Sequence, residues 1–180
     1  MQSSSAERAT VIKGIIQSAI LSVALFTSGY YFIPDNPKGL ETPMQRLVFT
    51  LRWQSVSILT FLFGIVKVAN KRFYTKAIDP ISGKGEQLLA VDSRYLQNTF
   101  EQFVLNAFGQ LVLSTYLNPG TASRVIPTLV LMFTLARILF WVGYQIAPLY
   151  RALGFSIGFQ STVAVTFCNL CFLLSYGAQF

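Results

Sequence analysis

Residues 93–103, with the sequence SRYLQNTFEQF, form a polar and partly charged stretch that opens a long apolar run. Arg94, Asn98 and Glu101 are spaced i, i+4 and i+7, and a helix of about 3.6 residues per turn places such residues on one face. The apolar residues that follow are numerous enough to extend this helix across a bilayer. The stretch therefore predicts a membrane helix with charged side chains on one face.

The composition of the whole chain is that of an integral membrane protein. Of its 180 residues, 53% are hydrophobic and 12% are charged, whereas an ordinary soluble domain has roughly 25% charged residues. The mean hydropathy is +0.51. The chain has no histidine, which excludes histidine metal sites and catalysis by Ser-His-Asp or Cys-His groups. The net charge of +7 arises from basic residues beside apolar segments, so it indicates membrane orientation and not nucleic-acid binding.

Apolar segments separated by turn signals predict an all-α integral membrane bundle of five transmembrane helices. The predicted helices cover residues 11–33, 47–69, 94–117, 124–147 and 152–176. Asp92 or Ser93 can cap the third helix and Ser123 the fourth, with Pro127 in its first turn. A cleaved signal peptide is the alternative for the first segment. That segment is longer than a typical signal and no A-x-A site follows it, so we expect a retained helix.

Basic residues are unevenly distributed around these helices. Nine lysines and arginines lie on the side of the N-terminus and three on the other side, which predicts a cytosolic N-terminus. In this topology a set of polar side chains lies at one depth, in or near the cytosolic half of the bundle. Its members are Lys71, Arg94, Asn98, Glu101, Arg137, Tyr144 and Arg151.

The charges in this set allow two interpretations. A charged side chain within a bilayer costs about 2.5–3.5 kcal/mol on insertion scales, so Glu101 and Arg137 should face the bundle interior. They could pair with each other and only hold the helices together. Cations outnumber this one acid, however, and unpaired buried positive charge indicates an anionic ligand. The surplus cations are Lys71, Arg94, Arg137 and Arg151.

Small and polar residues inside the predicted helices indicate close helix packing. Gly154 and Gly158 have the GxxxG spacing that lets two helices approach closely. Amide side chains within apolar segments predict hydrogen bonds between helices. These amides are Asn106, Gln110, Gln160 and Asn169.

The same residues carry a resemblance to a known family. Arg94-x-x-x-Asn98-x-x-Glu101, followed on the next helix by ARILF at 136–140 and then by Tyr144 and Arg151, resembles the MAPEG superfamily, the membrane-associated proteins in eicosanoid and glutathione metabolism. The resemblance covers roughly residues 66–176. It implies a homotrimer of four-helix protomers that binds glutathione between protomers near the cytosolic face.

Applied to this chain, the resemblance implies a domain division and a set of roles. Residues 47–180 would form the four-helix membrane domain, and residues 1–46 an accessory tail, helix and loop. Arg151 matches the arginine that stabilises the glutathione thiolate, because a fixed cation lowers the pKa of a nearby thiol. The implied activity is that of a glutathione transferase or peroxidase acting on lipophilic substrates. The residues implied to hold glutathione itself are Lys71, Arg94, Asn98, Glu101, Arg137 and Tyr144.

The chain also departs from the glutathione-dependent members. Gln102 and Phe140 stand where several eicosanoid-making members have tyrosine, and Lys71 stands where an arginine is expected. The additional first helix is more similar to the mattrin-like branch. That branch implies a non-catalytic role, with a membrane-protein partner, in secretory and endolysosomal trafficking and receptor turnover. The sequence leaves both functions open, and both imply membrane lipids as neighbours and an endomembrane location in the endoplasmic reticulum, Golgi or lysosome.

Overall fold

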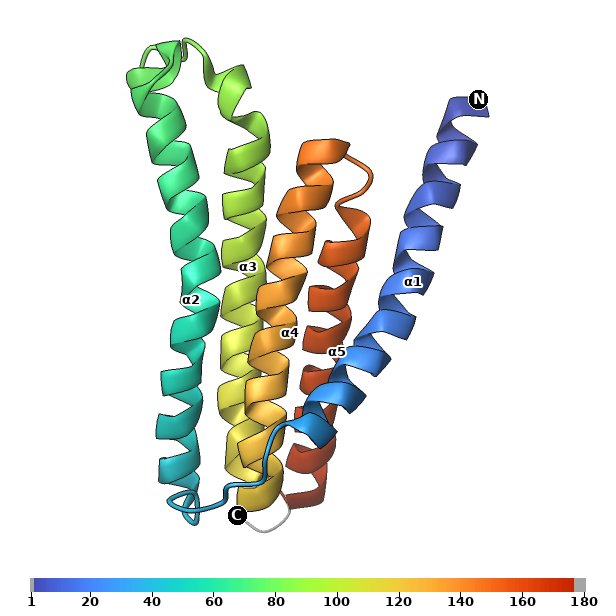
Figure 1. The fold of residues 1–180 in the computed structure, drawn as a ribbon, viewed down its shortest axis with the longest axis vertical. Coiled ribbons are helices and arrows are strands. Elements are labelled where there is room, and N and C mark those ends of the chain that lie inside the picture. Colours follow the sequence, from blue (N-terminus) through green and yellow to red (C-terminus); the bar gives the residue numbers. More distant parts are fainter. Residues whose placement is uncertain (1, 177–180) are drawn as a thin grey trace.

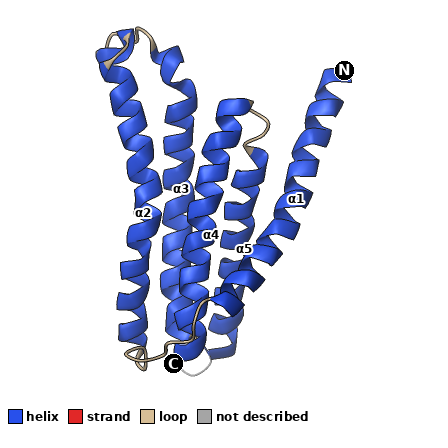
Figure 2. Ribbon diagram, viewed as in Figure 1, coloured by secondary structure: helices blue, strands red, loops and turns tan. Residues whose placement is uncertain are grey.

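The protein, described by a computed structural model over residues 2–176, is a bundle of five long helices (Figure 1). Consecutive helices run in opposite directions and are joined by short loops, as Figure 2 shows. The N-terminus, the α2–α3 connection and the α4–α5 turn lie at one end, called here the N-terminal end of the bundle (Figure 1). The all-α prediction is confirmed. The helices are α1 (Gln2–Phe32), α2 (Pro43–Phe73), the short 3-10 helix η1 (Lys76–Ile78), α3 (Glu86–Tyr116), α4 (Pro119–Ile146) and α5 (Ala152–Tyr176).

Four of these helices are long and apolar enough to cross a membrane, namely α1, α2, α4 and α5. The remaining helix, α3, has 31 residues but is too polar to meet the same criterion. Four of its polar side chains, Asp92, Gln102, Asn106 and Gln110, are buried inside the bundle. The predicted third span therefore has the length of a membrane helix without its apolar composition, and neighbouring helices cover one part of its polar surface.

Helices α1 to α4 all begin before their predicted starts, and a capping side chain marks the start of α2 and of α4. Thr42 forms a capping box with Gln45 at the start of α2. Asn118 accepts a hydrogen bond from the backbone N–H of Thr121 and starts α4 at Pro119, so Pro127 lies inside that helix and not in its first turn. Similarly, α3 starts at Glu86 instead of residue 94.

The caps predicted for the third and fourth helices are therefore wrong. Asp92 and Ser93 lie inside α3, and Ser123 lies inside α4. The residue before α3 is Gly85, whose φ of 78° is in the left-handed region that favours glycine. This turn follows η1, and a Cβ on Gly85 would lie 2.9 Å from the backbone nitrogen of Ala77.

Arg46 holds together the end of the bundle opposite the N-terminal end. Its side chain is only 6% exposed, and its guanidinium donates to four backbone carbonyls. Two of these belong to the last turn of α3, where helix carbonyls lack helical partners and the helix dipole is negative. The other two belong to the α1–α2 connection, so one side chain joins three segments. The four acceptors are the oxygens of Ser114 (2.9 Å), Thr115 (3.2 Å), Leu40 (3.0 Å) and Glu41 (3.0 Å).

A chain of amide side chains crosses the interior of the bundle. Gln54 Nε2 donates to Gln110 Oε1 at 2.8 Å, and Gln110 Nε2 donates to Asn106 Oδ1 at 2.6 Å. Asn106 Nδ2 then reaches Thr162 Oγ1 at 3.4 Å, so the chain links α2, α3 and α5. Because an unpaired amide in apolar surroundings is costly, these bonds fix the register of the three helices.

The glycine pair of α5 packs against α4. A Cβ on Gly154 would collide with the backbone nitrogen of Phe140 and lie 2.6 Å from the carbonyl oxygen of Ala136. A Cβ on Gly158 would lie 2.7 Å from Arg137 Nη2. The GxxxG spacing thus serves two purposes, since Gly154 lets two backbones meet and Gly158 leaves room for a buried guanidinium.

The first helix, α1, lies against α5 at the side of the bundle. Gln160 Nε2 donates to Ser18 Oγ at 3.0 Å, and Gly14 faces Ala152, whose Cβ would be 3.1 Å from a Cβ on Gly14. The predicted interhelical hydrogen bonds of the amide side chains are confirmed. Asn106 and Gln110 form theirs in the interior of the bundle, and Asn169 Nδ2 donates to the carbonyl oxygen of Gly109. The division at residue 46 remains a prediction.

We expect Arg46→Ala to lower the free energy of unfolding by at least about 2 kcal/mol, because four backbone carbonyls, two of them in fully buried hydrogen bonds, lose a charged donor. The matched control is Arg52→Ala on the same helix. Because the Arg52 side chain is exposed, we expect its removal to change the free energy of unfolding by no more than about 0.5 kcal/mol. Thermal melting of the two variants in detergent measures the difference. Equal melting temperatures would contradict the role assigned to Arg46.

Candidate functional site

A pocket of about 540 Å³ lies at the N-terminal end of the bundle, between α1, α3, α4, the α4–α5 turn and α5. It brings together two of the predicted site residues, Asn98 and Arg151, with apolar side chains from four elements. None of the described residues that line it is acidic. The lining residues are Val11, Ile15, Asn98, Phe140, Pro148, Leu149, Arg151, Ala152, Phe155, Ser156, Phe159 and Gln160.

Arg151 is held at the rim of this pocket by Tyr144. Pro148 follows the end of α4, and the tight turn after it places Arg151 immediately before α5. The guanidinium lies over the ring of Tyr144, 5.0 Å from the ring centroid, and Arg151 Nη1 is 3.5 Å from Tyr144 Oη. Tyr144 is buried and Arg151 is exposed. The aromatic face therefore positions the cation without neutralising its charge.

Arg137 lies behind Asn98 and is completely buried, with 0% of its surface exposed. Its Nη1 donates to Asn98 Oδ1 at 2.9 Å, and its Nη2 donates to the carbonyl oxygen of Gly154 at 3.3 Å. The rings of Phe133 and Phe140 lie 5.5 and 5.1 Å from the guanidinium carbon. Arg137 does not line the pocket. Its contact with a ligand would therefore pass through Asn98.

The bond to Arg137 fixes which end of the Asn98 amide meets a ligand. A guanidinium can only donate hydrogen bonds, so the amide oxygen of Asn98 is the atom that faces Arg137. Its Nδ2 group remains as a donor. The pocket therefore offers the Asn98 amide and the Arg151 guanidinium as donors beside apolar walls, an arrangement suited to an anion that also has an apolar part.

Lys71 lies outside the pocket and has its own carboxylate partner. Its Nζ is 2.9 Å from Asp92 Oδ2, and Gln145 Nε2 donates to Asp92 Oδ1 at 3.3 Å. Asp92, predicted as a cap, is instead a buried carboxylate that pairs with Lys71. The sequence contains a signal for this burial. Asp92 lies three residues before Tyr95 and seven before Thr99, so a helix places it on the same face as these two buried residues.

Glu101 and Arg94 are both exposed on α3 in the single chain. Glu101 Oε1 accepts a hydrogen bond from Gln97 Nε2 at 3.2 Å. Within residues 2–176 no ion pair joins Glu101 to Arg137. Arg137 lies in the bundle interior as predicted, with an amide and a carbonyl as its acceptors. The prediction that Glu101 also faces the interior is wrong for the single chain, and the interpretation in which the two residues pair is not supported there. Since Lys71 pairs with Asp92, the members of the cation surplus for which no acidic partner is seen within residues 2–176 are Arg94, Arg137 and Arg151.

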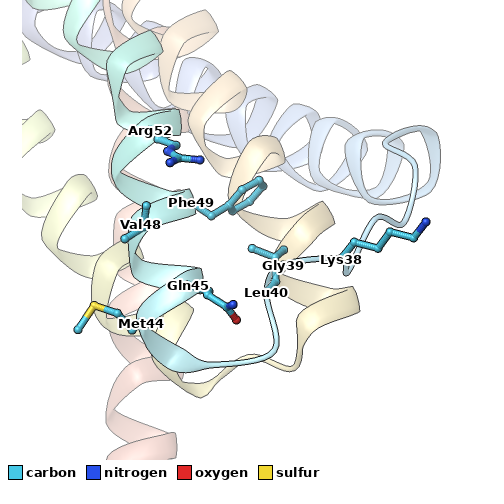
Figure 3. A pocket seen from close by; sticks show the side chains of 8 residues that line it. All are labelled: Lys38, Gly39, Leu40, Met44, Gln45, Val48, Phe49 and Arg52. Carbon is cyan, nitrogen blue, oxygen red and sulfur yellow. The ribbon is translucent and has the colours of Figure 1, made fainter.

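A second cavity, of about 390 Å³, lies near the opposite end of the bundle and is drawn in Figure 3. The basic side chains of Lys38 and Arg52 contribute to its lining, with Val48 and Phe49 as apolar neighbours on α2. None of the predicted site residues reaches it. We therefore assign the candidate site to the pocket of Asn98 and Arg151, which we call the Arg151 pocket.

The geometry separates a structural arginine from a ligand-facing one. Arg137→Ala should lower the free energy of unfolding by at least about 2 kcal/mol, because Asn98 and Gly154 lose their donor inside the bundle. Arg151→Ala should change it by less than about 0.5 kcal/mol, because that side chain is exposed. Thermal melting in detergent tests the contrast, and comparable losses in both variants would contradict it.

Comparison with known proteins identifies one matching family and two similar proteins among its findings. Residues 50–171 match the MAPEG family. The chain is also similar to Transmembrane protein 79 of mouse and of cattle, with 24% identity over 167 residues in each case. The match covers 93% of this chain and 42% of each relative, so the chain spans about two fifths of their length. No solved structure matches the chain significantly.

Proposed function

The chain belongs to the MAPEG family, and on that premise we propose that it is a membrane protein that binds glutathione in the Arg151 pocket. The membership agrees with the resemblance found in the sequence, and the relatives agree with its mattrin-like branch. The observation that carries the proposal is the presence of two donors, Asn98 and Arg151, in a pocket whose described lining has no acidic side chain. Glutathione offers two carboxylates and a thiol to such donors.

The residues around the pocket would have different roles in binding glutathione. The Arg151 guanidinium, held over Tyr144, provides a fixed cation that favours the anionic form of a neighbouring thiol and lowers its pKa. The Asn98 amide donates to a carboxylate, and Arg137 keeps that amide in its orientation. Bound glutathione would supply the nucleophilic sulfur for attack on a lipophilic electrophile or hydroperoxide. Arg137 and Tyr144 are thus positioning residues.

A homotrimer would explain the charged face of α3. Arg94 and Glu101 are exposed on the single chain, although charged groups at membrane depth are costly when they face lipid. A second copy packed on this face would cover both and could bring Arg94 and Glu101 close to a ligand held by Asn98. Lys71 does not need a partner copy, because Asp92 already pairs with it.

The second candidate function is non-catalytic, in secretory or endolysosomal trafficking and receptor turnover with a membrane-protein partner. One observation favours it. Phe140 lines the pocket without a hydroxyl group, no tyrosine is among the described lining residues, and Tyr144 is already in contact with the Arg151 guanidinium. The pocket would then bind a ligand without transforming it. In either function we propose an endomembrane location, in the endoplasmic reticulum, Golgi or lysosome, with the N-terminus in the cytosol.

The glutathione proposal predicts binding of glutathione to the detergent-purified protein, with the ultraviolet absorbance of a bound thiolate. In Arg151→Ala the thiolate signal should be lost, because the stabilising cation is gone. Arg52→Ala, at the other end of the bundle, serves as the matched control and should retain the signal. Binding without thiolate in the wild type would favour the non-catalytic function, and an absence of binding would contradict the proposal.

The assembly proposal predicts that native mass spectrometry of the purified protein finds three copies of the 20.1-kDa chain. Substitution of both Arg94 and Glu101 by alanine should weaken this assembly, because the face that they occupy would lie between copies. A protein that remains monomeric at high concentration in mild detergent would rule out the trimer.

A further inference from the structure

A polar pocket of about 370 Å³ lies where α2 ends, at the N-terminal end of the bundle. It shares no lining residue with the Arg151 pocket, and we call it the Lys67 pocket. Each residue that lines it carries a hydrogen-bonding group, whereas apolar residues make up most of the lining of the Arg151 pocket. The lining residues are Lys67, Asn70, Lys71, Tyr74 and Thr75 from α2 and the turn after it, Asp92 from α3 and Gln145 from α4.

A buried carboxylate forms one side of this pocket. Asp92 is only 3% exposed, and each of its two oxygens already accepts one bond. Oδ2 is 2.9 Å from Lys71 Nζ, and Oδ1 accepts from Gln145 Nε2 at 3.3 Å. A carboxylate oxygen can accept two hydrogen bonds, so Asp92 can also accept from a ligand hydroxyl. Lys71 neutralises its charge.

Lys67 supplies the net charge of the pocket. Its Nζ lies over the ring of Trp141, 5.4 Å from the centroid, which positions the ammonium group. Within residues 2–176 no ion pair includes Lys67. Asn70 and Tyr74 follow it by three and seven residues on the same helix face, and both are exposed. With Lys71 and Asp92 paired, the pocket has one positive charge beside neutral donors.

The position of Lys67 along α2 places the pocket at the level of lipid headgroups. Residues 53–66 contain no charged side chain, so Lys67 marks the point where the apolar part of this membrane helix ends. Beyond it, Phe73 is 67% exposed and Ile81 is 95% exposed. Basic residues beside exposed apolar ones at the end of a membrane helix are typical of contact with anionic lipids. The exposed basic residues of the α2–α3 connection are Lys76 and Lys84.

We propose that the Lys67 pocket binds the headgroup of an inositol phospholipid. The Lys67 ammonium binds the single phosphate, Asn70 and Tyr74 donate to it, and ring hydroxyls donate to Asp92. A headgroup with its own carboxylate, as in phosphatidylserine, would bring that carboxylate close to Asp92. The volume of about 370 Å³ is within the range of small-molecule sites. The ligand is a lipid because the pocket lies at the end of a membrane helix, beside exposed Phe73.

The test measures binding of dioctanoyl phosphatidylinositol to the full chain in mild detergent by native mass spectrometry. Lys67→Met, which keeps an unbranched side chain over Trp141, should weaken binding about tenfold, the loss expected for one charged donor. The matched control is Lys84→Met, which removes an exposed lysine of the same connection that does not line the pocket. It should change the affinity by less than about twofold.

A second pair of measurements tests recognition of the headgroup. Dioctanoyl phosphatidylserine carries the same net charge and should bind about tenfold more weakly than phosphatidylinositol. Tyr74→Phe removes one hydroxyl from a side chain on a residue that is 80% exposed, so the bundle should remain intact. This variant should bind phosphatidylinositol about threefold more weakly, the loss of one neutral hydrogen bond. Thermal melting of each variant checks the fold.

Equal losses in Lys67→Met and Lys84→Met would overturn the proposal, because binding would then depend only on the charge of the connection. Equal binding of the serine and inositol lipids would also overturn it. Glycerophosphoinositol, the same headgroup without acyl chains, distinguishes a soluble ligand from a lipid, and binding as tight as that of the lipid would exclude the lipid. Displacement of the lipid by glutathione would assign the pocket to glutathione instead. Lipid binding that glutathione does not affect would support the proposal whether or not the Arg151 pocket binds glutathione.

Discussion

The structure depends on one constraint, which is that a guanidinium inside an apolar bundle must have oxygen acceptors. Arg46 and Arg137 meet it in different ways. Arg46 uses four backbone carbonyls at one end of the bundle and so joins α2, α3 and the α1–α2 connection. Arg137 uses Asn98 and the carbonyl of Gly154, and it fits only because Gly158 has no side chain. These two residues together determine how α3, α4 and α5 lie against α2 and against one another.

The same constraint explains the character of α3. Its buried side chains are largely polar, and Gln110 and Asn106 form part of a hydrogen-bonded chain between α2 and α5. In a membrane, helices gain little from burying apolar surface against each other, so small residues and interhelical hydrogen bonds provide the specific contacts. Neighbouring helices cover one face of α3. The more apolar helices, α1, α2, α4 and α5, carry most of the surface that would face lipid.

The candidate site depends on segments that are far apart in the sequence. Asn98 comes from α3, Arg151 from the turn before α5, and Ile15 from α1. The two buried groups behind them, Arg137 and Tyr144, orient the side chains that line the pocket. A site of this kind combines a rigid interior with an exposed cation. That combination suits the recognition of an anionic ligand near the surface of a membrane.

The sequence by itself determined the class of protein, because length and apolar composition require helices in a membrane and because the spacing of Arg94, Asn98 and Glu101 can only be brought onto one face by a helix. Together with residues 136–140, Tyr144 and Arg151, the same residues carry the resemblance to the MAPEG family that the family match confirms. Sequence could not decide the partner of each charge, since Glu101 and Asp92 were equally available as acids, and only packing buried Asp92 against Lys71 and left Glu101 exposed. Tertiary structure likewise decided that α1 borders the pocket, because the contacts that seat it join residues far apart in the sequence, as between Ser18 and Gln160, which are 142 positions apart.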